Sequence, residues 1–522
     1  MCVCVCVCKR ERFIMPHRTF LHLFQGLWAI SLWQAACVSG GKLWEVPTAS
    51  ADPASNHTLC LMEEPQCKVQ LRHLQDAANI TTSTRPRLEG TWVSTRCEVR
   101  PGPEFLVRSY TFSGSPGYKF KALQHYYHDS ACSHPSYSLL ILGRLRLKQA
   151  SWIYRGSTEA NHHLLKVGIV VHSTLALNHT SKHLSSLCQG LGHDRLTPGH
   201  MYELFNIRKG QDCLGALGFS MLELELVRVE TKQSVSTRPI EELLLGDIHT
   251  DWSQRTQHRP SGYQTSLQNA MHHVHPCPVC ALVYRSSEQR PPILPPRTAL
   301  PLNLGGRWLS LRCETRPSVL FLTRDFAFHE DSRSWEGVYR HYSDPFCRQA
   351  TFTVRASGHY AGGGPSAKVG GATKLVFKVT EVSVSAYNQE MVAALNASKH
   401  GSCGSKGFWE VGIEQEVTST GGCTILGIRL PHKEYEIVRM ELDHQRRPLL
   451  YTGERPTDGS NPDRPHMRPT SFQPPLVQCS TSCPRHSHRF THVPVSSSQK
   501  DNGHMYILLL ILTAVLDLLR LC

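Results

Sequence analysis

Two short motifs in this chain contain side chains that could do chemistry. His125, His128 and Asp129 lie in the run His-Tyr-Tyr-His-Asp, and these residue types bind metals such as zinc. Cys277 and Cys280 have the Cys-x-x-Cys spacing of thioredoxin-type redox sites. Neither motif is complete, because a four-ligand zinc set is not evident and the cysteine pair does not open a helix after a strand.

An internal duplication tests both motifs. Residues 88–101 read Leu-Glu-Gly-Thr-Trp-Val-Ser-Thr-Arg-Cys-Glu-Val-Arg-Pro, and residues 304–317 read Leu-Gly-Gly-Arg-Trp-Leu-Ser-Leu-Arg-Cys-Glu-Thr-Arg-Pro. The distance between the copies far exceeds the roughly 20–50 residues of solenoid units, which indicates two whole homologous domains. The second copy has His341-Tyr-Ser-Asp344 and a Cys-x3-Cys pair instead. We therefore predict a structural hydrogen bond for each His–Asp pair and structural disulfides for the cysteines.

Enzyme motifs are not found elsewhere. The sequence contains no Gly-x-Ser-x-Gly elbow, P-loop or His-Glu-x-x-His. Glu98 and Glu314 recur beside a cysteine, and ion pairing with the recurring arginines is the plain explanation. We predict a binding protein with no catalytic residues, no metal and no cofactor.

The cysteines follow the duplication. Fourteen of them lie between the N-terminal signal and the terminal Cys522, an even number that predicts disulfides in an oxidising compartment. Six cysteines per copy allow 15 connectivities, and the sequence does not choose among them. The pair Cys60 and Cys67 has no later counterpart and predicts a small local loop. The predicted disulfide pool is Cys60, Cys67, Cys97, Cys132, Cys188, Cys213, Cys277, Cys280, Cys313, Cys347, Cys403, Cys423, Cys479 and Cys483.

Both ends of the chain predict secretion. A basic, then apolar, then small-residue stretch from Met15 to Ser39 is typical of a signal peptide. The Cys-Val repeat before Met15 is either a rarely translated extension or a set of acylated cysteines. The apolar segment 506–522 follows small residues and a polar spacer, so a lipid (GPI) anchor signal and a short single-pass helix both fit. Glycosylation sequons occur at Asn56, Asn79, Asn178 and Asn396.

The formal net charge of +14 favours acidic partners at the cell surface. Heparan sulfate and anionic lipid headgroups are candidates, a solvated basic surface without a ligand is the alternative, and the predicted compartment argues against nucleic acid. The sequence leaves open whether the protein forms a homo-oligomer.

Composition and the duplication predict the domain limits. Residues 1–39 form the extension and signal peptide, 40–85 an N-terminal segment, and 86–282 the first repeat domain. A proline-rich linker spans 283–302, the second repeat domain 303–485, a stalk 486–505 and the anchor segment 506–522.

The elements that carry these residues are predicted to be strands. Residues 104–112 and 320–328 alternate apolar and polar side chains, and further runs occur at 167–171, 374–380 and 221–229. Only 391–395 indicates a helical turn. Many strands with Gly/Ser turns predict an all-β chain of two tandem disulfide-bonded sandwiches or barrels.

A tryptophan and an arginine narrow this choice. Each copy opens with Gly-x-Trp, at Trp92 and Trp308, and ends its core with a strand that contains Arg228 or Arg439. This pattern resembles the lipocalins, in which such an arginine packs over the tryptophan and closes an up-and-down barrel. Cation–π stacking explains the pairing physically. The alternative is a core tryptophan and an unrelated surface arginine.

The doubled motif with six cysteines per copy resembles the adenomatosis-polyposis-coli-down-regulated family over roughly 86–483. The members of this family are cell-surface glycoproteins that inhibit Wnt signalling, and the chain is more similar to its "-like" branch. The resemblance implies binding to acylated Wnt proteins and to their low-density-lipoprotein-receptor-related co-receptors at the outer face of the plasma membrane.

An acyl chain requires a concave apolar site, which a barrel interior can supply. We therefore predict that the aromatic strand face, Tyr110, Phe112, Phe326 and Phe328, lines or flanks such a site. The alternative is that this face fills a solid core, as in many small barrels. A matrix or adhesion glycoprotein that binds acidic polysaccharide is the second functional hypothesis, and an unrecognised hydrolase the third.

Overall fold

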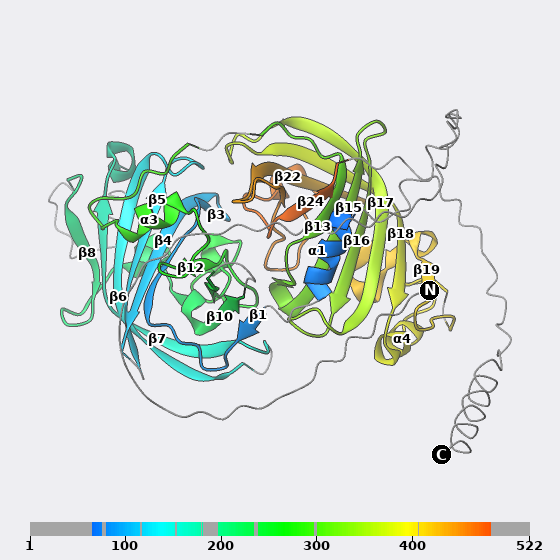
Figure 1. Cartoon of the computed structure of the whole chain (residues 1–522), viewed down its shortest axis with the longest axis horizontal. Helices are drawn as coiled ribbons and strands as arrows, with labels where there is room; N and C mark the ends of the chain where they lie inside the picture. Colours follow the sequence, from blue (N-terminus) through cyan, green and yellow to red (C-terminus); the bar gives the residue numbers. More distant parts are fainter. Residues whose placement is uncertain are drawn as a thin grey trace, which may run out of the picture. The chain divides into compact units, whose positions relative to one another are not determined.

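The computed structural model describes residues 65–75, 80–114, 117–151, 154–178, 180, 197–233, 238–296, 300–405 and 407–481. Strands dominate both repeats, as predicted, and Figure 1 shows them as two sets of long, curved, antiparallel arrows. The predicted signal peptide, stalk and anchor segment lie outside the described residues. Within the described ranges, no helix has both the length and the apolar character needed to cross a bilayer.

The first repeat forms one sheet with a short helix after it. Its strands are β1 (Ile80–Thr82), β2 (Gly90–Val93), β3 (Glu98–Arg100), β4 (Glu104–Ser113), β5 (Tyr118–Tyr127), β6 (Pro135–Ala150), β7 (Thr158–Val171), β8 (Met201–Asn206), β9 (Gln211–Asp212), β10 (Leu226–Lys232), β11 (Ile240–Leu245) and β12 (Leu267–Asn269). Helix α3 (Pro278–Tyr284) follows β12 with Cys277 as its N-cap, so the expectation that this cysteine pair opens no helix is wrong. The 3₁₀ turns are Leu214–Leu217, Leu222–Glu225 and Trp252–Gln254.

The second repeat has the same order of elements. Its strands are β13 (Gly306–Ser310), β14 (Glu314–Arg316), β15 (Leu320–His329), β16 (Ser334–Tyr342), β17 (Ala350–Pro365), β18 (Thr373–Ala386), β19 (Glu414–Glu416), β20 (Gly422–Cys423), β21 (Ile428–Arg429), β22 (His432–Leu442), β23 (Pro448–Thr452) and β24 (Leu476–Ser480). Helix α4 (Gln389–Asn396) extends the predicted helical turn, and the 3₁₀ turns are Pro317–Val319, Thr418–Thr420, Thr424–Leu426 and Pro465–Met467.

Each sheet closes on itself. In the first repeat the ring runs β2-β4-β5-β6-β7-β10-β11-β12 and back to β2, which makes a closed barrel of 8 strands. In the second repeat the ring runs β13-β15-β16-β17-β18-β22-β23-β24 and back to β13. Neighbours in each ring follow one another along the chain and pair antiparallel, so both barrels have the up-and-down topology predicted from the sequence. Closure leaves no unpaired edge in either ring.

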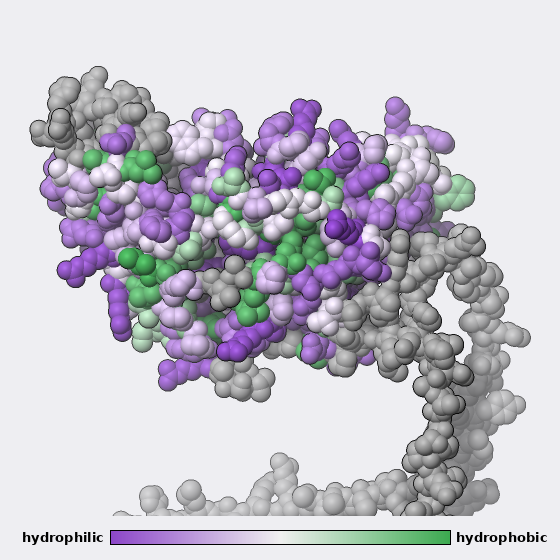
Figure 2. All heavy atoms as spheres, turned by 90° about the horizontal axis from the view of Figure 1, so that it is seen from above, coloured by the Kyte–Doolittle hydropathy of each residue, from purple (hydrophilic) through white to green (hydrophobic). Residues whose placement is uncertain are grey.

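Strand alternation directs one face of each strand into the barrel. In the first barrel, Leu106, Tyr110 and Phe112 of β4 face inward together with Val167 and Ile169 of β7, and all five are buried. Phe326, Phe328 and Trp335 occupy the inner face of the second barrel. Figure 2 shows that the face seen from above is mostly hydrophilic, with several smaller apolar patches.

One predicted strand is in part a turn. Residues 221–229 were expected to be extended, but Leu222–Glu225 form a 3₁₀ turn and the strand begins at Leu226. The turn directs the Glu223 side chain toward the Tyr110 hydroxyl, 3.3 Å away, and its backbone carbonyl accepts from Gly246 N–H. The sequence pattern did not reveal this, because a single 3₁₀ turn is too short to show a period of its own, and here it buries the adjacent residues Glu223 and Leu224.

The N-terminal segment belongs to both repeats. Strand β1 pairs with β10 of the first barrel, whereas α1 (Pro65–Gln75) contacts β13 and β24 of the second. Cys67 forms a disulfide with Cys479, so the prediction of a local loop between Cys60 and Cys67 is wrong. Cys67 and Cys479 lie 412 residues apart in the sequence, and only folding brings them together.

The linker lies against the first barrel. The Tyr127 hydroxyl donates to the Pro292 carbonyl at 2.5 Å, and Leu294 is buried beside Cys132. Residues 285–296 contain no helix or strand, in keeping with their proline content.

Candidate functional site

A buried frame is common to the two barrels. The indole N–H of Trp92 donates to the Leu88 carbonyl at 2.8 Å, and that of Trp308 to the Leu304 carbonyl at 2.7 Å. Each tryptophan therefore pairs its only polar group with a backbone carbonyl just before its own strand, and its ring fills the barrel interior.

The predicted ion pairs between the recurring Glu and Arg are confirmed. Arg108 donates to Glu98 at 2.7 Å, and Arg324 donates to Glu314 at 2.9 Å, with all four side chains buried. A serine completes each set: Ser94 donates to Glu98 and Ser310 to Glu314. Because a buried charge is costly without its partner, this set is part of the architecture and not a reactive site.

The predicted stacking of arginine on tryptophan is wrong. Arg228 lies over the Phe346 ring at 5.1 Å and pairs with Glu230, while Arg439 lies over Phe472 at 4.5 Å and over Tyr451. The reason is strand alternation. Val227 and Val229 face the core that contains Trp92, so Arg228 between them points to the other face of the sheet.

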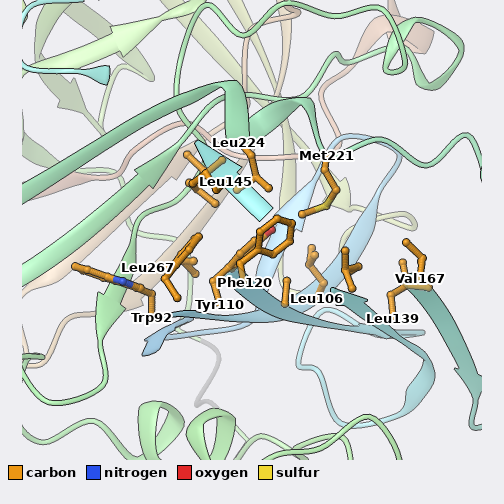
Figure 3. Packing of buried hydrophobic residues seen from close by; sticks show 14 of the residues in the cluster. Trp92, Leu106, Tyr110, Phe120, Leu139, Leu145, Val167, Met221, Leu224 and Leu267 are labelled. Atoms are coloured by element: carbon orange, nitrogen blue, oxygen red, sulfur yellow. The ribbon is translucent and has the colours of Figure 1, made fainter. Parts of the chain in front are cut away.

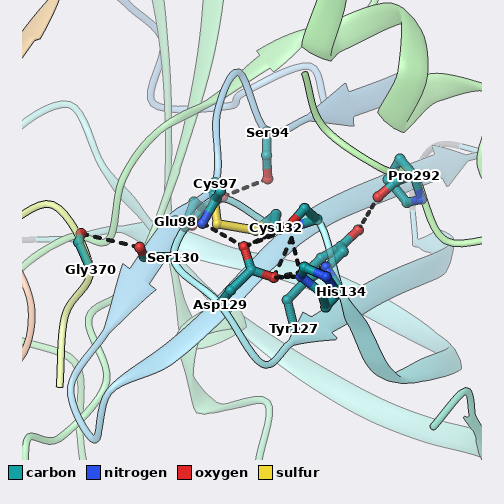
Figure 4. Close-up of a disulfide and its surroundings, with 12 residues drawn as sticks. Ser94, Cys97, Glu98, Tyr127, Asp129, Ser130, Cys132, His134, Pro292 and Gly370 are labelled. Atoms are coloured by element: carbon teal, nitrogen blue, oxygen red, sulfur yellow. Dashed lines mark hydrogen bonds and ion pairs between the residues drawn. A yellow bond between two sulfur atoms is a disulfide. The ribbon is translucent and has the colours of Figure 1, made fainter. Parts of the chain in front are cut away.

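The predicted His–Asp bonds are also replaced by other contacts. His125 contacts Ser138 at 2.7 Å and Ser286 at 3.1 Å through its two ring nitrogens. Asp129 instead accepts from three backbone N–H groups in the turn that contains Cys132, as Figure 4 shows. Asp344 does the same in the second repeat. Both acids therefore stabilise a turn beside a disulfide.

The described disulfides are Cys67–Cys479, Cys97–Cys132, Cys277–Cys280, Cys313–Cys347 and Cys403–Cys423. Cys213 is disulfide-bonded as well, whereas Cys60, Cys188 and Cys483 lie outside the described residues. His273 lies close to Cys277 and Cys280. The sulfur atoms of the two cysteines are joined in a disulfide, so they are not thiolates that could bind a metal.

Two of the four glycosylation sequons fall on described residues. Asn178 is exposed, and Asn396 is partly buried, where its side chain both donates to and accepts from the Trp409 backbone. Asn56 and Asn79 lie outside the described residues.

The interior of the first barrel contains a continuous polar chain. Arg100 donates to the Tyr126 hydroxyl, Tyr126 to Gln124, Gln124 to the Tyr110 hydroxyl, and Tyr110 to Glu223. Apolar side chains surround it, and Figure 3 shows Leu106, Phe120 and Met221 near Tyr110. Burial raises the pKa of the Tyr126 hydroxyl to about 12, so it remains a neutral donor.

The interior of the second barrel is hollow. A cavity of about 350 Å³ lies inside the ring, within the range of small-ligand sites. Its aromatic wall comes from β15, β16 and β18, and its polar wall from β14, β22 and the segment after β23. The lining residues are Arg316, Pro317, Ser318, Leu320, Leu322, Arg324, Phe326, Phe328, Trp335, Tyr339, His341, Phe377, Leu426, Glu434, Glu436, Thr452, Arg455, Pro456, Gly459, Ser460, Asn461 and Gln473.

The aromatic wall is built by edge contacts. Phe326 meets Trp335 and Tyr339 at centroid distances of 6.3 and 5.4 Å, and Phe377 meets Trp335 at 5.6 Å. Gly337 makes this possible, because a Cβ there would lie 2.7 Å from the Phe326 ring.

The polar wall contains two adjacent carboxyl groups. Glu434 pairs with Arg455 at 2.7 Å, and Glu436 accepts from Gly453 N–H at 2.8 Å. Burial, with the negative Glu434 beside it, raises the pKa of Glu436 well above its usual range. Burial alone would raise the pKa of Glu434 too, but Arg455 holds it below the usual range.

Three buried nitrogen atoms of residues on the cavity wall have no hydrogen-bond partner among the residues that the structure describes. They are Arg316 Nε, Trp335 Nε1 and His341 Nδ1. His341 stacks on Phe352 with a centroid distance of 4.3 Å, and burial, with Arg316 nearby, lowers its pKa to about 4. Buried N–H groups are rarely left unpaired, so this wall fits a ligand that also carries hydrogen-bond acceptors.

Two residues of the predicted aromatic face, Phe326 and Phe328, line the cavity. Tyr110 and Phe112 belong to the buried cluster of the first barrel. Sequence reasoning missed the polar wall. The Glu-x-Glu run at 434–436 and the Arg-Pro pair at 455–456 were visible, but nothing in the sequence indicated that they face the same hollow as Phe326.

Two closed barrels, one with an internal cavity walled by rings on one side and charges on the other, define an all-β protein with tandem barrel domains. A model of the family described as adenomatosis polyposis coli down-regulated 1 matches residues 66–295 and 297–489. The chain therefore belongs to that family, as its doubled motif indicated. The two matched segments correspond to the two barrels.

Proposed function

We propose that this protein is a membrane-anchored negative regulator of Wnt signalling at the cell surface, and that it binds the acyl chain of Wnt in the cavity of the second barrel. The observation that carries the proposal is the cavity itself, about 350 Å³ with a continuous aromatic wall. Family membership is consistent with a role in Wnt inhibition.

Burial of the chain supplies the affinity. Each methylene group removed from water contributes about 0.8 kcal/mol, so six buried methylenes contribute roughly 5 kcal/mol before the cost of association. Ring faces of Phe326, Phe328 and Trp335 offer the apolar contact.

The unpaired nitrogens suit the polar end of the ligand. Arg316 Nε and His341 Nδ1 are available for a carbonyl oxygen, because an acyl group joined to protein ends in an ester. A ligand that is apolar throughout would leave these groups unsatisfied, which disfavours a plain hydrocarbon.

The sequence supports the proposed location and the proposed partners. The predicted signal peptide and C-terminal anchor segment would hold the barrels outside the cell, next to Wnt receptors. The net charge of +14 favours retention by heparan sulfate near the membrane. Binding to a low-density-lipoprotein-receptor-related co-receptor is a further part of the proposal.

The test is binding of acylated Wnt and of the same Wnt lacking its acyl group to the full chain displayed on cells. Capture of the acylated form alone is the expected result. Equal capture of both forms would remove the acyl mechanism, and capture of neither would remove Wnt as the ligand.

Two matched substitutions test whether the ligand binds in the cavity. Phe328→Ala and Phe112→Ala remove the same side chain from equivalent positions, one in the cavity and one in the packed core. We expect only Phe328→Ala to weaken capture of acylated Wnt at equal surface expression. An equal loss for Phe112→Ala would show that capture does not depend on the cavity.

A further inference from the structure

The two repeats contact each other through a surface that is nearly the same on both. Arg312 pairs with Glu230 at 3.5 Å, and Arg96, which corresponds to Arg312, pairs with Glu441 at 3.9 Å. Glu230 and Glu441 occupy the same position in the two barrels, beside Arg228 and Arg439. Reciprocal contacts of this kind are the signature of a twofold interface.

Apolar contacts repeat the pattern. Phe105 packs with Val369 and Ile437 of the second repeat, and its counterpart Phe321 packs with Tyr154 and Leu226 of the first. Val369 and Ile437 occupy the positions in the second repeat that Tyr154 and Leu226 occupy in the first. The apolar contacts are therefore reciprocal, as the ion pairs are.

Two threonines mark the pseudo-axis. Thr250 and Thr457 lie four residues after the corresponding glycines Gly246 and Gly453. Thr250 N–H donates to the Thr457 hydroxyl at 2.9 Å, and Thr457 N–H donates to the Thr250 hydroxyl at 3.0 Å. A residue that exchanges hydrogen bonds with its own counterpart lies on the axis.

The entrance of the cavity lies at this interface. Among its lining residues Ser318, Leu320, Gly459 and Asn461 are exposed, so the segments 317–320 and 456–461 form the opening. Ser318 N–H donates to the Ser261 hydroxyl of the first repeat at 3.1 Å. Thr457, within the other segment, is held by Thr250.

We propose that the first repeat sets the entrance to the cavity of the second by holding these two segments through Ser261 and Thr250, and thereby controls the exchange of acyl ligands. This inference rests on the proposed function, because the ligand is the acyl chain proposed above. Ser261 and Thr250 are positioning residues, since neither lines the cavity.

The interface itself provides a matched control. Gly102 corresponds to Ser318, and Gly102 N–H donates to the Thr470 hydroxyl at 2.8 Å. Thr470→Ala therefore removes a similar hydrogen bond from the same interface on the side of the first barrel, away from the entrance. Comparison with Ser261→Ala separates an effect on the entrance from general loosening of the two repeats.

The experiment measures release of a fluorophore-labelled palmitoyl probe from the full chain after addition of unlabelled competitor. One hydrogen bond contributes about 1 kcal/mol, so we expect roughly fivefold faster release for Ser261→Ala and an unchanged rate for Thr470→Ala. Equal release rates for wild type and Ser261→Ala, or equal acceleration by both variants, would overturn the proposal. Thermal denaturation of both variants checks that they remain folded.

A cross-link provides the opposite perturbation. The Thr250 and Thr457 hydroxyl oxygens lie 3.3 Å apart, so Thr250→Cys with Thr457→Cys brings two thiols into reach of a disulfide. We expect slower release when the cross-link forms and wild-type release for the double Thr→Ser variant. A cross-linked protein with wild-type release would contradict control by the first repeat.

The outcomes distinguish this inference from the proposed function. If the wild-type chain does not bind the palmitoyl probe, the proposed function fails and the inference fails with it. If the wild type binds the probe and no variant changes the release rate, only the inference fails.

Discussion

The two barrels have the same ring of strands and the same Ser–Glu–Arg frame, yet the described side chains at the centres of their interiors differ. In the first barrel, Tyr110 and Tyr126 connect Arg100 to Glu223 through hydrogen bonds. At the corresponding positions of the second barrel, the register of β15 and β16 places Phe326 and His341. The polar chain is thereby interrupted, and the cavity lies where it would run.

The shared frame and the differing central residues have separate roles. Removal of one frame residue would leave a buried charge without its partner, so the frame stabilises both barrels. The central residues differ between the copies, and in the second barrel they border the cavity. Helix α1 and the Cys67–Cys479 disulfide attach the N-terminal segment to the second barrel.

The largest expected effect tests the shared frame. Arg108→Ala and Arg324→Ala should each cost about 3–5 kcal/mol, because Glu98 or Glu314 is left buried without its partner. Denaturant unfolding of the two variants measures this free energy. A much smaller loss for one variant would show that the frames are not equivalent in the two barrels.

Removal of the disulfide on the second barrel comes next. Cys67→Ser with Cys479→Ser opens a loop of sequence separation 412 and should cost about 2–4 kcal/mol. Cys277→Ser with Cys280→Ser opens a separation of only 3 and serves as the control. Because α1 contacts β13 and β24, proteolysis should detect the loss in the second barrel first. Equal losses for the two pairs would contradict this order.

An exchange of the central residues is expected to have a smaller effect. Phe326→Tyr introduces the hydroxyl of the first barrel into the cavity and should weaken binding of the palmitoyl probe about tenfold, because the chain must cover a polar group. Tyr110→Phe should cost the first barrel about 1 kcal/mol and leave probe binding unchanged. A probe affinity that is insensitive to Phe326→Tyr would mean that the chain does not reach this wall.

The smallest effect concerns pH. The pKa of His341 is lowered to about 4 from the usual 6.5, so the folded state binds fewer protons than the unfolded chain between these values. The contribution of His341 to stability is therefore present above pH 6.5 and is lost as the pH falls toward 4. Unfolding measured across this range should show a shallower slope for His341→Gln than for the wild type.

Glu454 contributes a pH dependence of stability with the opposite sign and serves as an internal check. Burial raises its pKa to about 7, so its contribution is present below the usual carboxyl pKa of 4.5 and is lost as the pH rises through 7. Glu454→Gln should therefore make stability rise more steeply with pH between about 4.5 and 7, a range that overlaps the one in which His341 acts. An unchanged curve for Glu454→Gln would show that its carboxyl group titrates normally.

The sequence by itself determined the duplication, the all-β class, the pairing of Glu98 and Glu314 with recurring arginines, and the family, because these depend on local alternation and on motifs compared between the copies. Only the tertiary structure decided which arginines these are, that Cys67 joins Cys479, that Arg228 points away from Trp92, and that Phe326 faces the cavity. The reason is physical. Alternation tells which residues share a face, but which faces meet, and whether the space between them is filled, depends on side chains that lie hundreds of residues apart and come together only when each ring of strands closes.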